Sequence, residues 1–330
     1  MSRSRKLVVM LAMLTGLVAG CTASETPGPH PSAEPAPRLP LTKVLAAVRR
    51  APAIRTLPSG LTPPLTPPLT APLTGAGSDL GFDSDKCEAG PSATRIDACV
   101  FGDPAGSTRV VLLGDSHASM WLPALSEIAQ RRHWQLTFYG KPACPASDIT
   151  FWNQRLGRAF TECDQFRSFA VGRIRATRAA LVLVADSSYV QKAGPGQTVT
   201  ATEWQRGLTR TLARLRRSGA RVIVIGDAPV LARSGPECLA VHARNIVTCF
   251  TTRAMATERV WNAADEAAAR ATGSGYVSVL PWLCGAVCTP VVGNVLVYRN
   301  QFDLTATYSR MLNGVLESAL VRSFPQENAP

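Results

Sequence analysis

The sequence predicts an α/β fold in which helices cover both faces of a central parallel sheet. From about residue 81 onward, five apolar stretches typical of strands alternate with five stretches typical of helices. The strand-like stretches are continuously apolar, as in parallel strands buried on both faces. Gly140, Ser187 and Asp227 come just after the ends of successive strands. Because ligands bind at the carboxyl edge of open α/β sheets, we expect the functional residues there.

The individual elements follow from this pattern. We expect strands over residues 109–113, 135–139, 179–185, 221–225 and 276–280, and helices over 119–132, 161–177, 201–218, 251–272 and 304–321. A stretch of about 250 residues is long enough to bury one substantial core. We therefore expect residues 81–330 to form one domain.

The first 20 residues have the layout of a secretory signal peptide. Three positive charges precede an apolar stretch over residues 7–18, and small residues then lead to Cys21. This order resembles a bacterial lipobox, which implies that Cys21 carries a lipid as the first residue of the mature protein. A plain signal peptide followed by an unrelated cysteine is the alternative. We expect a protein anchored by lipid on the outer face of the cytoplasmic membrane, in the cell envelope.

Residues 21–80 have the composition of a tether. Prolines recur throughout this segment, and proline both lacks the backbone N–H and fixes φ, so regular helix or central strand is disfavoured. Extended, polyproline-like backbone is expected instead. Within it, residues 41–55 have the pattern of a short amphipathic helix.

The cysteines indicate an oxidising compartment. Apart from Cys21 there are eight, which allow 105 pairings, so sequence alone does not establish the connectivity. They fall into four pairs that are local in sequence, and we predict these as disulfides: Cys87–Cys99, Cys144–Cys163, Cys238–Cys249 and Cys284–Cys288. None of the four histidines has ligand spacing to a cysteine pair, so we expect no metal and no cofactor.

The net charge of +12 does not by itself identify a partner. The arginines are spread over the predicted helices, and no basic stripe interleaved with aromatic residues is present, so nucleic-acid binding is not expected. A basic surface outside the membrane favours anionic envelope polymers or lipid headgroups.

The stretch Val110–Trp121 contains the candidate nucleophile. A buried strand runs into a Gly-Asp-Ser-His turn and then into a helix, which places the Ser116 hydroxyl at the carboxyl end of a parallel strand. Backbone N–H groups at the start of that helix are suited to binding an oxyanion. A turn with a serine that merely caps the helix is the alternative.

The sequence around Ser116 resembles the first block of SGNH (GDSL-type) hydrolases, and most of all the SGNH domain that follows the membrane acyltransferase-3 domain in bacterial O-acetyltransferases. Further matching stretches are Arg49-Arg50, Leu61-Thr62-Pro63, Lys141-Pro142-Ala143-Cys144-Pro145, Val224–Pro229, Val297-Tyr298-Arg299 and Leu304–Tyr308. The resemblance covers about residues 45–320. It implies a flavodoxin-like three-layer sandwich with a central five-stranded parallel sheet, and a chemistry that moves or removes acyl groups, commonly acetyl, on surface glycans.

The catalytic partners that this resemblance implies are altered. The family pattern Tyr-Arg-Asp-x-x-His-Leu-Thr reads here with Asn300 in the aspartate position and Asp303 in the histidine position. An asparagine cannot stabilise an imidazolium by charge, and an aspartate with a pKa near 3.9 is a weak base for a serine proton. Burial beside Ser116 would raise that pKa. His117 or His242 is the alternative base, and capping of the helix that follows is the alternative role for Asp303.

The resemblance also implies an oxyanion site. Its donors are the backbone N–H of Ser116 and that of Gly140, whereas the asparagine side chain that the family uses as a third donor has no clear match. Ser187 and Ser188 follow the third strand, where that donor would sit, and we count Asp115 and Ser187 among the residues near oxyanion and substrate.

Three functions are compatible with these residues. The first is an acyl esterase or O-acyltransferase with Ser116, Asp303 and Asn300 as catalytic residues, acting on acylated envelope glycan or lipid. The second is an inactive relative that binds such a polymer. The third is an accessory lipoprotein that assists a separate membrane acyltransferase.

Overall fold

A computed structural model describes residues 36–65, 74–188, 192–257 and 259–323. They belong to a compact unit that begins at Ala36. The predicted signal peptide and Cys21 lie outside the described residues. None of the helices within these ranges combines the length and the apolar character needed to cross a bilayer.

The central sheet has six strands in the order β1-β3-β2-β6-β9-β11. They are β1 (Cys99–Gly102), β2 (Thr108–Gly114), β3 (Trp134–Gly140), β6 (Leu181–Ala185), β9 (Arg221–Ile225) and β11 (Gly275–Val277). The five predicted strands are confirmed and run parallel to one another. The additional strand β1 is antiparallel to β3 at the edge. It is short and partly exposed, with Val100 at 47% exposure, so it lacks the continuous apolar signal of the others.

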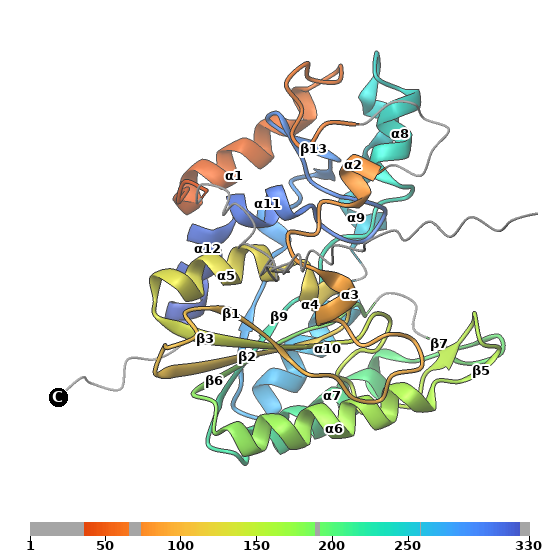
Figure 1. Ribbon diagram of the computed structural model, residues 1–330. Coiled ribbons are helices and arrows are strands. Elements are labelled where there is room, and N and C mark those ends of the chain that lie inside the picture. Colours follow the sequence, from red (N-terminus) through yellow and green to blue (C-terminus); the bar gives the residue numbers. More distant parts are fainter. Residues whose placement is uncertain (1–35, 66–73, 189–191, 258, 324–330) are drawn as a thin grey trace, which may run out of the picture. The chain divides into compact units, whose positions relative to one another are not determined.

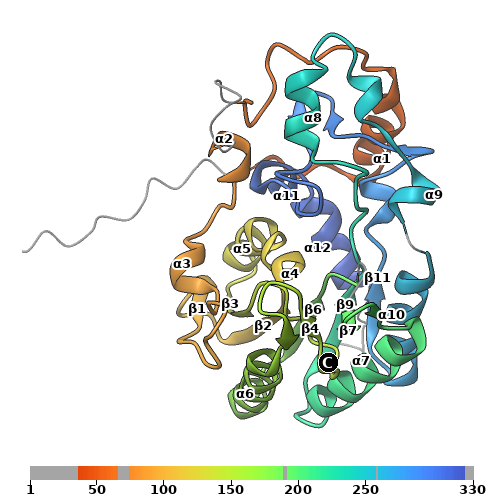
Figure 2. The same ribbon diagram turned by 90° about the vertical axis from the view of Figure 1, so that its right-hand side faces the viewer.

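Helices cover both faces of this sheet, which confirms the three-layer architecture (Figures 1 and 2). Helices α6 (Thr161–Thr177), α7 (Ala201–Arg216) and α10 (Arg259–Ala271) lie on one face, and α5 (Leu122–Arg131), α11 (Ala306–Met311) and α12 (Asn313–Arg322) lie on the other. Alternate residues of β2 enter the two cores. Val110 and Leu112 pack in the cluster that contains Leu316, whereas Val111 and Leu113 pack in the cluster that contains Trp204.

Three predicted helices are interrupted. The stretch 119–132 forms the single turn α4 (Ser116–Ser119) followed by α5, because Pro123 near the start of α5 has no N–H to continue the helix. The stretch 251–272 contains β10 (Thr251–Thr252), α9 (Arg253–Ala256) and α10. The stretch 304–321 divides into α11 and α12, and α11 starts only after Thr305, whose hydroxyl accepts a hydrogen bond from the Tyr308 N–H.

Small elements complete the fold. Helices are α1 (Leu41–Arg50), α2 (Thr74–Gly77), α3 (Ser84–Cys87) and α8 (Gly235–Val241). Two-stranded sheets join β4 (Trp152–Asn153) to β5 (Arg158–Ala159), β7 (Lys192–Gly194) to β8 (Gln197–Thr198), β10 to β12 (Val287–Cys288), and β13 (Val291–Val292) to β14 (Val295–Leu296). All four predicted disulfides are present: Cys87–Cys99, Cys144–Cys163, Cys238–Cys249 and Cys284–Cys288.

Much of the predicted tether belongs to the folded unit. The amphipathic helix predicted within it is α1, which buries Val44 and Val48 in the core shared with α12. The extended backbone that follows is hydrogen bonded on both sides. The Thr62 N–H donates to the Asn294 carbonyl at 2.8 Å, and the Leu296 N–H donates to the Thr62 carbonyl at 2.9 Å. The domain therefore begins near residue 36 and not at the predicted residue 81, because this segment supplies both apolar side chains and backbone partners.

We expect Val44→Asp to lower the free energy of unfolding by at least about 2 kcal/mol, because the substitution buries an unpaired charge. Urea unfolding of the oxidised mature chain measures this change. Lys43→Asp, on the exposed face of the same helix, is the matched control and should change it by less than about 0.5 kcal/mol. Equal stability of the two variants would mean that α1 is part of a tether after all.

Candidate active site

The turn between β2 and α4 presents Ser116 at the carboxyl edge of the sheet. Gly114, the last residue of β2, has φ of +153°, and a Cβ added there would lie 1.9 Å from the Ala185 carbonyl oxygen. Only glycine fits this approach between β2 and β6. Asp115 then caps α4, and Ser116 is the first residue of that helix. The structure thus places the serine where the sequence predicts it.

Asp115 shapes this turn from within. Its carboxylate accepts a hydrogen bond from the His117 N–H at 2.9 Å, and both of its oxygens lie 3.0 Å from the Ser187 N–H. The side chain is buried. The Asp115 carboxylate and the Ser187 amide are engaged with each other, and together they join the turn to the end of β6. Asp115 is thus occupied within the protein, whereas a place for Ser187 beside the substrate stays a prediction.

His117 points into the protein and lies between two carboxylates. Its Nδ1 is 2.5 Å from Oδ1 of Asp227, and its Nε2 is 3.8 Å from Oδ1 of Asp303. The second Asp227 oxygen accepts hydrogen bonds from the N–H and the hydroxyl of Ser188, both at 2.9 Å. Burial would lower the pKa of His117, but the surrounding carboxylates, Asp227 first, raise it to about 10. At neutral pH His117 is an imidazolium without a free lone pair, so it is unsuited to act as the base.

Asn300 and Asp303 form one tight turn. The Asn300 side-chain oxygen accepts from the N–H groups of Phe302 and Asp303, both at 2.7 Å, while its amide donates to Oδ2 of Asp303 at 2.7 Å. Arg299 donates to the same Asp303 oxygen at 2.8 Å. Asp303 is not the cap of the following helix, since Thr305 has that role.

The Ser116 side chain lies close enough to the Asp303 carboxylate to lower its pKa. Oδ1 of Asp303 is buried and has no hydrogen-bond partner among the described residues. Burial raises the pKa of Asp303, but His117, Arg299, Asn300 and Ser116 together outweigh burial, and the pKa is lowered below its usual value. Burial alone therefore does not decide the pKa of Asp303, because these neighbours stabilise the ionised form. Asp303 is an ionised but weakly basic group beside the candidate nucleophile.

Gly140 ends β3 beside this turn. A Cβ added there would lie 2.0 Å from the Phe138 ring, so glycine is required, and residue 140 pairs with Gly114 in the sheet. On its other side it forms a bridge with Glu88, where the Ala89 N–H donates to the Gly140 carbonyl at 2.8 Å. The role of Gly140 as an oxyanion donor stays a prediction.

Lys141 fixes the loop that follows Glu88. Its buried ammonium donates to the carbonyls of Gly90 at 2.5 Å and of Pro91 and Ala93 at 2.9 Å each. Desolvation lowers the pKa of Lys141 to about 8. These three bonds explain why a lysine stands directly after β3: it satisfies carbonyls of an irregular segment that runs along the sheet edge.

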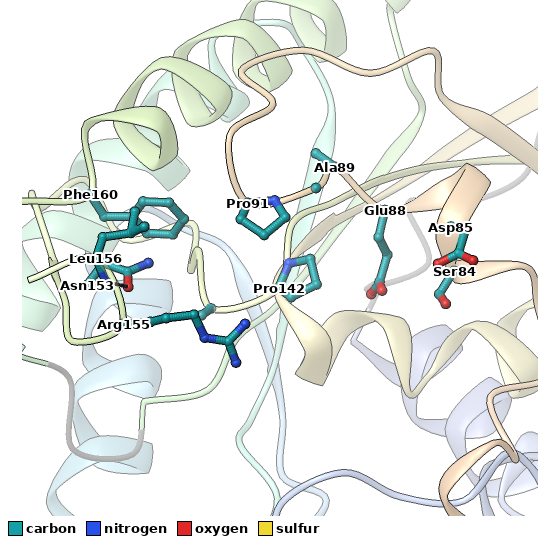
Figure 3. A pocket seen from close by; sticks show the side chains of 12 residues that line it. Ser84, Asp85, Glu88, Ala89, Pro91, Pro142, Asn153, Arg155, Leu156 and Phe160 are labelled. Carbon is teal, nitrogen blue, oxygen red and sulfur yellow. Dashed lines mark hydrogen bonds between the residues drawn. The ribbon is translucent and has the colours of Figure 1, made fainter. Parts of the chain in front are cut away.

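A cavity of about 460 Å³ opens between the segment around Glu88 and the loop that follows β3 (Figure 3). It is lined by Ser84, Asp85, Glu88, Ala89, Gly90, Pro91, Pro142, Ala143, Asn153, Arg155, Leu156 and Phe160. Figure 3 shows Asn153, Arg155 and Leu156 on one side, Ser84, Asp85 and Glu88 on the other, and Pro142 between them. Its volume is within the range of small-molecule sites.

Sequence reasoning missed two functional candidates, the pairing of Asp227 with His117 and the carboxyl of Glu88. Asp227 follows β9, so the strand-end pattern that pointed to this edge contained its signal. Glu88 lies in an irregular segment after Cys87 and has no such signal.

His242, the other base considered, ends α8 and is not among the groups that shift the pKa of Asp303. Within the described ranges, no group of three histidine, cysteine, aspartate or glutamate residues is suited to hold a metal ion.

Comparison with known proteins agrees with the fold. The family model described as "SGNH domain (fused to AT3 domains)" matches residues 85–318. The periplasmic domain of a lipopolysaccharide acetyltransferase from Salmonella ser. Paratyphi A has a TM-score of 0.52 at 16% identity, over 65% of this chain and 84% of that domain. A putative acylhydrolase from Bacteroides fragilis has a TM-score of 0.42 at 12% identity, over 67% and 90% of the two chains. No curated protein matches the chain.

We expect Asp227→Asn to lower the free energy of unfolding by about 3–5 kcal/mol, because it leaves the His117 imidazolium buried without its main partner. Adding His117→Gln to Asp227→Asn should recover part of this loss, since the uncompensated charge is then removed. Chemical denaturation at pH 7 measures both, with the exposed Asp97→Asn as the control.

The same pair predicts a pH dependence. The folded-state pKa of His117 is raised from 6.5 to about 10, so its stabilisation is fully present below pH 6.5 and is lost as the pH rises through 10. Asp227→Asn should flatten the decline of stability over this window. An unchanged slope in that variant would contradict the assignment of the charge to His117.

Proposed function

Because the chain belongs to the family of SGNH domains that are fused to AT3 domains, we propose that it is a cell-envelope lipoprotein that hydrolyses or transfers acyl esters with Ser116 as nucleophile. The observation that carries the catalytic part is the position of Ser116 directly after β2, next to the Asp303 carboxylate whose pKa it lowers. Asp303 occupies the place that the family resemblance gives to a histidine base.

The chemistry is a two-step acyl transfer. The Ser116 oxygen attacks the acyl carbonyl carbon, its proton passes to a carboxylate of the site, and the alcohol leaves, so that an acyl-serine ester forms. Water or a second hydroxyl then attacks this ester. In protease examples, loss of a triad partner lowers turnover by roughly 10⁴-fold, which sets the scale of the deficit expected with Asp303 as base.

An acetylated surface glycan or lipid is the proposed substrate. The Salmonella neighbour is described as a lipopolysaccharide acetyltransferase domain, which motivates acetyl as the acyl group. The positive net charge of +12 favours anionic envelope polymers. The charged start, apolar stretch and small residues before Cys21 support secretion and lipid anchoring.

A second candidate function is binding without turnover, alone or in support of a separate membrane acyltransferase. The lowered pKa of Asp303 favours it, since a carboxylate held by Arg299 and Asn300 is a poor proton acceptor. The two candidates differ in whether Ser116 becomes acylated.

We expect the oxidised mature chain to hydrolyse a small acetyl ester slowly, and Ser116→Ala to abolish this activity. The exposed Ser168→Ala on α6 is the matched control and should leave the rate unchanged. The double substitution Asn300→Asp with Asp303→His should raise the rate by about 100-fold or more, because it supplies an imidazole base with a charged partner.

The activities of the unaltered chain and the three variants are compared as initial rates of hydrolysis of a chromogenic acetate ester. If the unaltered chain is no faster than Ser116→Ala while the double variant gains activity, the chain is a binding protein on an intact scaffold.

We also expect Cys21→Ser to move the protein from the membrane fraction to the soluble fraction after secretion, because one thiol would carry the lipid. Fractionation of host cells, with immunodetection of the protein in each fraction, measures this distribution. Retention of Cys21→Ser in the membrane would contradict the lipid anchor.

A further inference from the structure

Glu88 is held firmly at the edge of the sheet. It follows α3, and the residues on either side of it are fixed: Cys87 by its disulfide to Cys99 of β1, and Ala89 by its hydrogen bond to Gly140. The next carbonyls along the chain are held by Lys141. The Glu88 side chain therefore projects from a rigid segment.

The carboxyl of Glu88 lies between the cavity and the nucleophile turn. Glu88 lines the cavity (Figure 3), and its carboxyl lies close enough to the Ser119 side chain for Ser119 to lower its pKa. The Ser119 hydroxyl in turn donates to the Ser116 carbonyl at 2.9 Å. The Oε1 atom is buried and has no hydrogen-bond partner among the described residues. A buried carboxyl oxygen left without a partner is costly, so this position is suited to a proton or to a ligand hydroxyl.

Burial makes Glu88 more basic than Asp303. Burial raises its pKa and the nearby Asp303 raises it further, while Ser119 and Arg299 oppose this; the net result is a raised pKa. Asp85 and Arg155 are the other charged groups on the cavity wall, and His117 lies behind Asp303. The two carboxyl pKa values are thus shifted in opposite directions: the pKa of Asp303 is lowered and that of Glu88 is raised.

We propose that Glu88 is the acid–base residue of the second step, deacylation, and that the cavity it lines binds the hydroxyl-bearing acceptor, a sugar or water, that takes the acyl group from Ser116. This inference rests on the proposed function. The acceptor oxygen attacks the carbonyl carbon of the acyl-serine while Glu88 takes the acceptor proton. The bond from that carbon to the Ser116 oxygen then breaks, and Glu88 returns the proton to this oxygen.

The cavity fits such an acceptor. Glu88, Asn153 and Arg155 supply polar contacts for hydroxyl groups, and Pro142 and Leu156 supply apolar contacts for the faces of a sugar ring. Its volume of about 460 Å³ is sufficient for a small glycan unit.

The test is Glu88→Gln, which keeps the shape of the side chain and removes the titration. With a chromogenic acetate ester, we expect the initial burst that reports acetylation of Ser116 to persist and steady-state turnover to fall about 100-fold. Intact mass measures the acetyl-enzyme directly. The unaltered chain should lose turnover as the pH falls through the raised pKa of Glu88, above 4.5, and Glu88→Gln should lack this acid limb.

Glu88→Asp retains the carboxyl and should keep an acid limb at a lower rate, whereas a purely structural role predicts no such distinction. Glu266→Gln, an exposed carboxylate on α10, is the control and should behave as the unaltered chain. If the unaltered chain is acetylated and Glu88→Gln turns over at the same rate, this inference is wrong and the proposed function stands. If Ser116 is never acetylated in the unaltered chain, both fall. Loss of the burst in a folded Glu88→Gln would also overturn the assignment to the second step.

Discussion

The site depends on one buried cation, the imidazolium of His117. It lies between the carboxylates of Asp227 and Asp303, which come from the end of β9 and from the turn before α11. Separate parts of the chain are thus joined electrostatically directly behind Ser116. Moving one of these elements away would leave a buried charge without its partner, which costs several kcal/mol. The ion pairs therefore fix the geometry at the carboxyl edge.

This cation also determines what Asp303 does. His117 on one side and Arg299 on the other stabilise the negative charge of Asp303. These contacts explain how an aspartate is accommodated where the family resemblance implies a histidine. The same stabilisation lowers its basicity. Asn300 retains the shape of the turn through its two accepted hydrogen bonds and its donated one, without adding a second negative charge. The altered pair is therefore structurally consistent and chemically weakened.

The features predicted from sequence are those with a local signal. The parallel strands have continuous apolar runs, the four disulfides join cysteines close in sequence, and the Ser116 turn follows a strand directly. The missed features arise from contacts between distant segments. The edge strand β1 lacks an apolar run. The predicted helix α1 belongs to the folded unit because its apolar residues are buried in the core that contains α12. The pKa of Asp303 depends on His117, which is 186 positions away in the chain.

The distribution of proton affinity over the site follows from these contacts. Asp303 is held ionised by His117, Arg299 and Asn300, whereas the pKa of Glu88 is raised by burial and by Asp303 itself. An environment that pushes two neighbouring carboxyl pKa values apart is typical of sites that separate a charged role from a proton-exchanging role. Ser116 lies beside the first carboxyl, and the cavity lies beside the second. In the proposed reaction, the carboxyl with the raised pKa is therefore the one that faces the incoming acceptor.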